Sequence, residues 1–324
     1  MQTNLQRGGA LLTVLWLSAA LTAIAFSIAN TVRGETERTA TTVEQAKAYY
    51  LASGSIDRAI LWMQWGRQMP RNPDGTARFW APGLPVMQMA FPTGVTQVEV
   101  IPESSKFNIN LATPIELLQL FIAMGLNPER AQALMAAVVD WRQPMQGGPS
   151  EFDQIYASLT PSFRARHASF EQIEELLSVR GVTPDLFYGT WVRNANGQLI
   201  RTAGLKDCLG LYGLNSQFDV NTTAPPVLSA LGLPPDVVGQ IVARRAVRPF
   251  LLPQELGAVV QAAGPAGGKL RMGGNSTYTL RATATLHNSD VRRSVAAVIK
   301  YNWDEKDEMT PYHVLRWYDN AGTN

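Results

Sequence analysis

Residue types that could carry catalysis are sparse and scattered in this chain of 324 residues. Cys208 is the single cysteine, and the three histidines, His167, His287 and His313, fall in separate segments. The sequence has no His-Glu-x-x-His, Gly-x-Ser-x-Gly or phosphate-loop motif, and Gly267-Gly268-Lys269 lacks the spacing and the hydroxyl of a phosphate loop. Because catalysis needs several such groups together, we expect the protein not to be an enzyme.

Composition narrows the class of protein further. The formal net charge is only +2, too small to indicate nucleic acid as the main partner. A lone cysteine cannot form an intrachain disulfide, so packing or a metal must hold the fold together. The length suggests two folded units in addition to the N-terminal segment.

The N-terminal segment predicts a membrane span. Ala10 to Ala29 carries no charged residue, and about 20 such residues suffice for a helix to cross a bilayer. Residues 1–8 form a polar leader whose basic residue, Arg7, favours a cytoplasmic location. Three alternatives stay open: an uncut anchor, a leader cut before the apolar stretch, and a signal peptide cut at Ser27-Ile28-Ala29. The length of the stretch argues against the signal peptide.

The polar sequence after Arg33 continues the helix as an amphipathic spine. Apolar and small residues recur there at steps of three and four residues, namely Ala46, Tyr49, Ser53, Ile56, Ile60 and Met63. Gly66, Pro70 and the turn-forming residues 72–75 then end the helix. We therefore expect a transmembrane segment over 9–32 and a spine over 33–69.

An internal repeat predicts a helical domain over residues 108–265. Residues 106–114 resemble residues 217–225, and both segments precede an apolar helix, a Gly-Leu step and a second helix. Asn110 and Pro114 in the first copy correspond to Asn221 and Pro225 in the second. We interpret the two asparagines as helix caps or turn formers, and the two copies as helix-hairpin-helix-like units.

Alternating residues predict strands on both sides of this domain. Segments 95–101, 278–286, 294–301 and 313–318 have a period of two. The expected fold is α+β: a long N-terminal transmembrane and amphipathic helix packs on a small antiparallel sheet, into which the all-α domain of two repeats is inserted. Residues 70–107 and 266–324 supply the two parts of the sheet domain.

The chain resembles the GspK family, the minor pseudopilins of the bacterial type II secretion system, also called general secretion pathway protein K. The resemblance rests on the start Arg7-Gly8-Gly9, on Asp140-Trp141-Arg142, and on the order of leader, spine, strand, helical insertion and final strands. It implies cleavage after Gly8 by prepilin peptidase, a methylated Gly9, and a single-pass inner-membrane protein with a periplasmic head.

The resemblance also implies a position in the filament. Thr13 occupies mature position five, where most pilins have a glutamate thought to face a neighbour's terminal ammonium. A buried acid is costly without such a partner, so a subunit with nothing stacked above it needs none. The implied role is to cap the pseudopilus tip and initiate its assembly with GspI, GspJ and, as a further candidate, GspH. The complex would help to export folded proteins across the outer membrane.

Calcium is the one cofactor that the resemblance implies. Asp140, Glu151 and Asp153 are candidate ligands, because a hard cation prefers oxygen atoms. The family usually has more acids directly after Asp-Trp-Arg, whereas residues 143–145 here are Gln, Pro and Met. An equal alternative is that these acids are solvated loop residues.

The alternative function is a membrane-anchored DNA-binding protein of the competence type, built on the helix-hairpin-helix units. Such units need glycine-paired hairpins, and the candidate hairpins at 179–182 and 230–233 have one glycine each. The nearby bases Arg244, Arg245 and Arg248 are local and not part of a broad patch. We therefore do not expect nucleic acid to be a partner.

Overall fold

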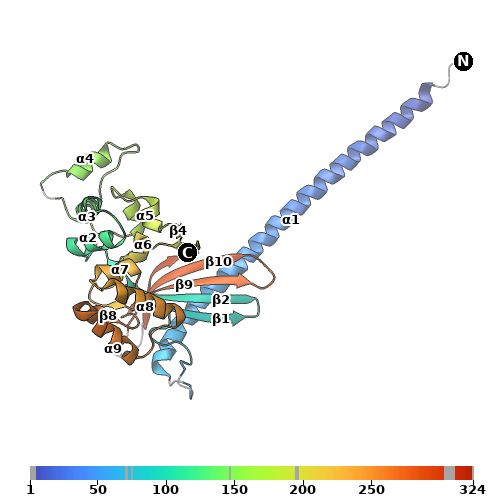
Figure 1. Ribbon diagram of the computed structural model, residues 1–324. Helices are drawn as coiled ribbons and strands as arrows, with labels where there is room; N and C mark the ends of the chain where they lie inside the picture. The colour runs from blue at the N-terminus through green and yellow to red at the C-terminus, as the bar shows by residue number, and fades with distance from the viewer. Residues whose placement is uncertain are drawn as a thin grey trace.

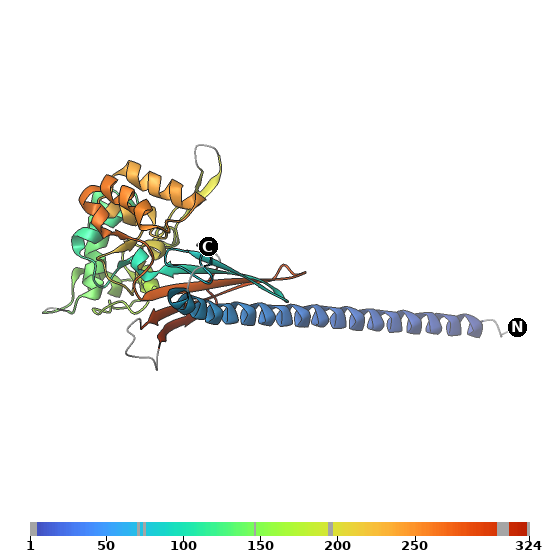
Figure 2. The ribbon, with the colours of Figure 1, turned by 90° about the horizontal axis from the view of Figure 1, so that it is seen from below.

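One long helix projects from a head made of a sheet and a helical domain (Figure 1). The computed structural model describes residues 5–69, 72–73, 76–145, 147–193, 197–302 and 311–322, without the side chains of residues 5–8 and Arg67. Helix α1 (Leu5–Gln68) has 64 residues, which at about 1.5 Å per residue gives a length of roughly 96 Å. The helical domain lies at the opposite end of the molecule from the N-terminus (Figure 2).

The head half of α1 lies on an antiparallel sheet. In the described residues the strand order is β1-β2-β9-β10-β11. The strand bounds are β1 (Val86–Phe91), β2 (Gly94–Pro102), β9 (Thr277–Leu286), β10 (Arg292–Tyr301) and β11 (Tyr312–Tyr318). This arrangement confirms the predicted α+β fold, with β1 as an additional strand that the sequence analysis missed.

Alternation along the central strand explains why the sheet has two unlike faces. Along β9 the buried residues face α1, while Thr279, Arg281, Thr283 and Thr285 between them stay partly exposed. Ser55 on α1 donates a hydrogen bond of 2.9 Å to Thr96 on β2, so even the polar groups at this interface are paired. The core between helix and sheet is otherwise apolar.

The buried face of α1 differs in part from the predicted stripe. Ile56, Ile60 and Met63 are fully buried as expected, but Ala46 is exposed and Ser53 is half-buried. The remaining contacts come from small residues that let the helix approach the strands closely: Ala48, Ala52, Ser55 and Ala59. The predicted and observed faces coincide from Ile56 onward, but before it the buried positions 48 and 52 lie one or two residues away from the predicted ones.

The helical domain is inserted between two neighbouring strands, β2 and β9, and spans residues 103–276. This segment is longer than the predicted 108–265. Its first half contains η1 (Glu103–Ser105), β3 (Phe107–Asn108), α2 (Pro114–Ala123), α3 (Pro128–Arg142), α4 (Glu151–Ala157), η2 (Ile173–Ser178), α5 (Pro184–Tyr188), β4 (Trp191–Arg193), β5 (Leu199–Arg201), α6 (Leu205–Cys208) and β6 (Leu209–Gly210). Its second half contains β7 (Phe218–Asp219), α7 (Pro225–Ala230), α8 (Pro235–Val247), α9 (Pro253–Ala262), η3 (Gly264–Lys269) and β8 (Leu270–Arg271).

Each repeat closes on itself through a short parallel strand pair. Strand β3 opens the first repeat and pairs with β6 at its end, and β7 pairs in the same way with β8 in the second repeat. The rings of Phe107 and Phe218, at equivalent positions in the two opening strands, meet edge to face with centroids 4.9 Å apart. These strands were not predicted, because two-residue strands leave no periodic pattern in a sequence.

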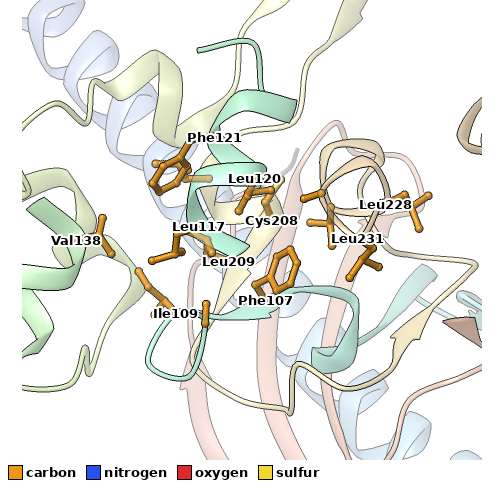
Figure 3. Packing of buried hydrophobic residues seen from close by; sticks show 14 of the residues in the cluster. Phe107, Ile109, Leu117, Leu120, Phe121, Val138, Cys208, Leu209, Leu228 and Leu231 are labelled. Carbon is orange, nitrogen blue, oxygen red and sulfur yellow. The ribbon is translucent and has the colours of Figure 1, made fainter. Parts of the chain in front are cut away.

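The two repeats share one apolar core, separate from the core under α1. Figure 3 shows Leu117, Leu120 and Cys208 of the first repeat in one packed cluster with Leu228 and Leu231 of the second. Burial raises the pKa of the Cys208 thiol, so this cysteine acts as a small apolar residue. Two cores agree with the two folded units expected from the length.

Gly66 provides a test of how closely the end of α1 fits the head. A Cβ atom at this position would lie 1.9 Å from the carbonyl oxygen of Trp80, whereas a Cβ on Gly54 of the same helix would meet no atom within 4 Å. We predict that Gly66→Ala lowers the free energy of unfolding by about 1–3 kcal/mol. Gly54→Ala, the matched control, should leave it unchanged or raise it by up to about 1 kcal/mol. Equal unfolding midpoints for the two variants in a denaturant titration would contradict this packing.

Candidate functional site

The processing segment lies at the start of α1. The helix backbone runs through Arg7 and Gly8 without a break, but the side chains of these two residues lie outside the described part. Gly9 is exposed, and a Cβ added to it would meet no described atom within 4 Å. Cleavage after Gly8 therefore stays a prediction.

Thr13 satisfies its hydroxyl within the helix. Its Oγ1 donates to the carbonyl oxygens of Ala10 at 2.9 Å and of Gly9 at 3.3 Å. A hydroxyl bonded in this way can enter a bilayer core without an external partner, which a carboxylate cannot do. Around it, the side chains of residues 9–32 are exposed on all sides of the helix.

The apolar half of α1 meets the requirements of a membrane span. Among the described residues one helix is long and apolar enough to cross a membrane, with a mean hydropathy of 2.1 in its most apolar window and none of that window buried against the head. An unburied apolar helix needs an apolar environment outside the protein. Length and composition thus agree with the transmembrane segment expected from the sequence.

The repeat asparagines join distant segments and do not cap helices. The side chain of Asn110 accepts from the amide of Phe170 at 2.8 Å and donates to its carbonyl at 3.0 Å. Asn221 makes the same two bonds with Phe250, at 2.7 and 2.9 Å, and also donates to the carbonyl of Gly83. The helix caps expected as one alternative are thus corrected, whereas the turns expected as the other are present at both asparagines. Each asparagine clamps the backbone of a phenylalanine later in its own repeat.

Different residues begin the helices that follow the asparagines. Thr113 caps α2 in a reciprocal capping box with Glu116, whereas α7 begins after Ala224 without a side-chain cap. Pro114 and Pro225 both occupy the first turn of their helices, where a missing amide hydrogen costs nothing. The capping box followed the sequence rule for Thr-x-x-Glu, which would have identified Thr113.

In each repeat, an arginine from a later helix donates hydrogen bonds to the loop that contains the clamping asparagine. Arg142 donates to the carbonyls of Ile109 and Ala112, and Arg245 donates to those of Val220 and Thr223. Burial lowers the pKa of both guanidinium groups, which are held by neutral carbonyls. Sequence reasoning missed this role, because the two arginines lie at different distances from the starts of their helices, at the end of α3 and within the last turn of α8.

In each repeat, a glutamate bonds the backbone amides that follow the clamped phenylalanine. Glu175 accepts from the amides of Glu171 and Gln172, both at 2.9 Å, just after the clamped Phe170. Glu255 accepts from the amides of Leu251 and Leu252 at 3.0 and 3.2 Å, just after Phe250. The spacing from phenylalanine to glutamate, which is the same in both copies, is therefore a structural element of the repeat.

The bases considered for DNA binding are engaged within the protein. Arg244 pairs with Glu255 at 2.7 Å, Arg248 lies 3.4 Å from the same carboxylate, and Arg245 bonds backbone carbonyls. The helices that follow the two candidate hairpins also start with acids, Asp185 in α5 and Asp236 in α8. Acids at these helix starts would repel the phosphates that such hairpins bind.

The three candidate calcium ligands do not converge. Ser150 donates to Asp140 at 3.1 Å, and Asp153 accepts from the Ser150 amide at 2.9 Å. Both oxygens of Asp153 also lie 2.9 to 3.0 Å from Nε2 of His167. Glu151 is exposed at the start of α4. Within the described residues there is no group of three or more His, Cys, Asp and Glu side chains placed to hold a metal. Because calcium also binds carbonyl oxygens, calcium binding here stays a prediction.

Fold and site together define a class: a protein with one long N-terminal helix, apolar enough to cross a membrane, and a pilin-like head enlarged by a helical insertion. The family model described as "Type II secretion system (T2SS), protein K" matches residues 104–188. The type II secretion system protein K of Pectobacterium carotovorum subsp. carotovorum is 28% identical over 205 residues, and that of Klebsiella pneumoniae is 25% identical over 199 residues. Each match covers 56% of this chain and 60% of the relative.

A solved structure has the same fold. A chain of the crystal structure of the GspK-GspI-GspJ complex from the type 2 secretion system of enterotoxigenic Escherichia coli matches with a TM-score of 0.54 at 16% identity. The match covers 87% of this chain and 98% of that one. With the family model and the two relatives, it confirms the resemblance to the GspK family that the sequence indicated.

The ion pair of His167 with Asp153 predicts a pH dependence of stability. Burial opposes the charge on each group, but their mutual hydrogen bond and attraction outweigh it, with help from the Ser150 amide for Asp153. The pKa of His167 is therefore raised and that of Asp153 is lowered. A raised histidine pKa stabilises the fold fully below the unfolded value of about 6.5, and this contribution disappears as pH rises through the folded pKa.

We therefore expect the difference in thermal midpoint between the wild type and His167→Gln to be largest near pH 5 to 6 and to shrink toward pH 9. At much lower pH the difference should also fall, as Asp153 becomes protonated. His287→Gln, at an exposed position, is the control and should follow the wild-type curve. A difference that stays constant across this range would show that the pair is not ionised.

Proposed function

We propose that this chain is a minor pseudopilin that caps the tip of the type II secretion pseudopilus, initiates its assembly and helps to export folded proteins across the outer membrane. The observation that carries the proposal is the place of the insertion in the head. It leaves the sheet where Pro102 pairs with Tyr278, and Tyr301 beside Tyr278 bonds Ile60 near the end of α1. The added domain thus lies at the head end of the molecule, opposite the N-terminus (Figure 2).

Bulk at this end supports a terminal position. Subunits of a helical filament stack along their spine helices. A large domain at the head end would therefore occupy the space that the next subunit above needs. Thr13 is consistent with this view, because a tip subunit has no neighbour above whose terminal ammonium would need an acid. The role is mechanical assembly, and it involves no catalytic step by this chain.

The proposed partners are other minor pseudopilins. The complex of the structural neighbour contains GspI and GspJ, and we propose the corresponding proteins as partners of this chain, with GspH as a further candidate. The face of α1 away from the sheet supports this, because it presents exposed apolar residues beyond the membrane segment, among them Val43 and Tyr50. Neighbouring spine helices could bury these side chains.

The proposed location is the bacterial inner membrane, with the head in the periplasm. The apolar half of α1 supports anchoring, and the basic leader residue favours a cytoplasmic N-terminus. Prepilin peptidase is then the enzyme expected to remove residues 1–8 and methylate Gly9. Calcium binding by Asp140, Glu151 and Asp153 remains a separate prediction, which their positions do not favour.

The mature N-terminus tests the proposed function. We expect mass spectrometry of the chain from its native membrane to find a start at methylated Gly9, and Gly8→Val to leave the leader attached and abolish secretion. Gln6→Asn, within the same leader, is the matched control and should be processed normally. A mature chain that starts at Asn30, or normal processing of Gly8→Val, would exclude a pseudopilin.

A further inference from the structure

A cavity of about 330 Å³ lies where the sheet meets both helical repeats. Its lining includes Glu99 of β2 and Arg281 of β9, Lys106 before β3, Lys206 and Asp207 of α6, and Thr222 before α7. Three cationic side chains from separate segments therefore converge on one cavity, with two acids beside them. We refer to this space as the seam cavity.

Arg281 is incompletely bonded in the seam cavity. Its side chain is only 18% exposed, and its Nε is buried with no hydrogen-bond acceptor among the described residues. Its Nη1 lies 3.4 Å from Glu99, at the long limit for a hydrogen bond. Buried guanidinium groups are normally fully bonded, so Arg281 has capacity for another acceptor.

Asp207, one of the two acids that line the cavity, already has hydrogen-bond partners. Asp207 accepts from Arg201 and from the amide of Gly204, both at 2.8 Å. Lys106, which is half-buried, makes no ion pair within 4 Å with an acid in the described part of the chain. Positive charge in the cavity is therefore incompletely neutralised.

Mutual repulsion among these cations is visible at Lys206. Burial lowers the pKa of its ammonium, and the nearby charges of Arg201, Arg281 and Lys106 lower it further, although Asp207 opposes them. An anion placed between these groups would relieve the repulsion. It would also give a charge-assisted partner to Arg281, whose planar fork matches the oxygens of a carboxylate or phosphate.

We propose that the seam cavity binds a small oxyanion, of the size of a phosphate or a dicarboxylate, held by Arg281 with Lys106 and Lys206. The ligand would contact the sheet and the first half of the insertion at once, next to Thr222 of the second half. It would therefore hold the helical domain in place on the pilin-like sheet. This inference does not depend on the proposed function, since it concerns the internal seam of the head.

The test uses the full chain in detergent, titrated separately with sodium phosphate, sodium succinate and sodium chloride at matched ionic strength. We expect phosphate or succinate to raise the thermal midpoint by about 2–4 °C in a saturable manner, while chloride does not. Comparison of the two arms identifies the preferred oxyanion. Arg281→Gln and Lys106→Gln should each weaken the apparent affinity at least tenfold.

Arg180→Gln is the matched control, because Arg180 is exposed on the first repeat and does not line the cavity, and it should bind as the wild type does. If Arg281→Gln does not fold, Lys106→Gln alone tests the proposal, because a substitution at the half-buried Lys106 should leave the fold intact. Three results would overturn the proposal: an equal response to chloride, no response to either oxyanion, or unchanged affinity in the folded cavity variants.

Discussion

The close packing of α1 on the sheet is the constraint on which the rest of the molecule depends. Alanines at positions 48, 52 and 59 leave room for the helix backbone to approach the strands, and Ile56, Ile60 and Met63 fill the core beside them. The same helix continues without a break into the apolar segment. Any force on the apolar half of the helix would therefore pass directly into the head, as the proposed role in a filament requires.

The insertion solves a different problem, namely how to hold a large domain on two adjacent strands. Each repeat brings its distant ends together with a parallel strand pair and an asparagine clamp, and an arginine bonds the carbonyls of the loop that carries the clamp. Asn221 also reaches the carbonyl of Gly83, in the segment that leads into β1. The second repeat is thus tied to the pilin-like part by a buried side chain, and the seam cavity lies beside this connection.

Much of this fold could be predicted from the sequence because its signals are local. The long helix, four of the five sheet strands and the repeat follow from periodicity and from turn residues. Strand β1 was missed because its methionines, Met87 and Met89, give a weak strand signal. The clamps were misread because Asn110 and Asn221 precede helices in sequence, while their partners Phe170 and Phe250 are 60 and 29 residues away. Such partners become visible only once the chain is folded.

The continuity of the spine can be measured by electron paramagnetic resonance on the full chain in a lipid bilayer, with nitroxide labels on Thr36→Cys and Gln97→Cys. Cys208 is buried and should stay unlabelled. Thr36 lies 19 residues before Ser55 on α1. Ser55 bonds Thr96, which is next to the second label. The labels should therefore be separated by about 28 Å along the helix axis. A rigid, continuous spine predicts one narrow distance distribution near this value. A broad or bimodal distribution would show that the helix bends or separates from the head, and would contradict it.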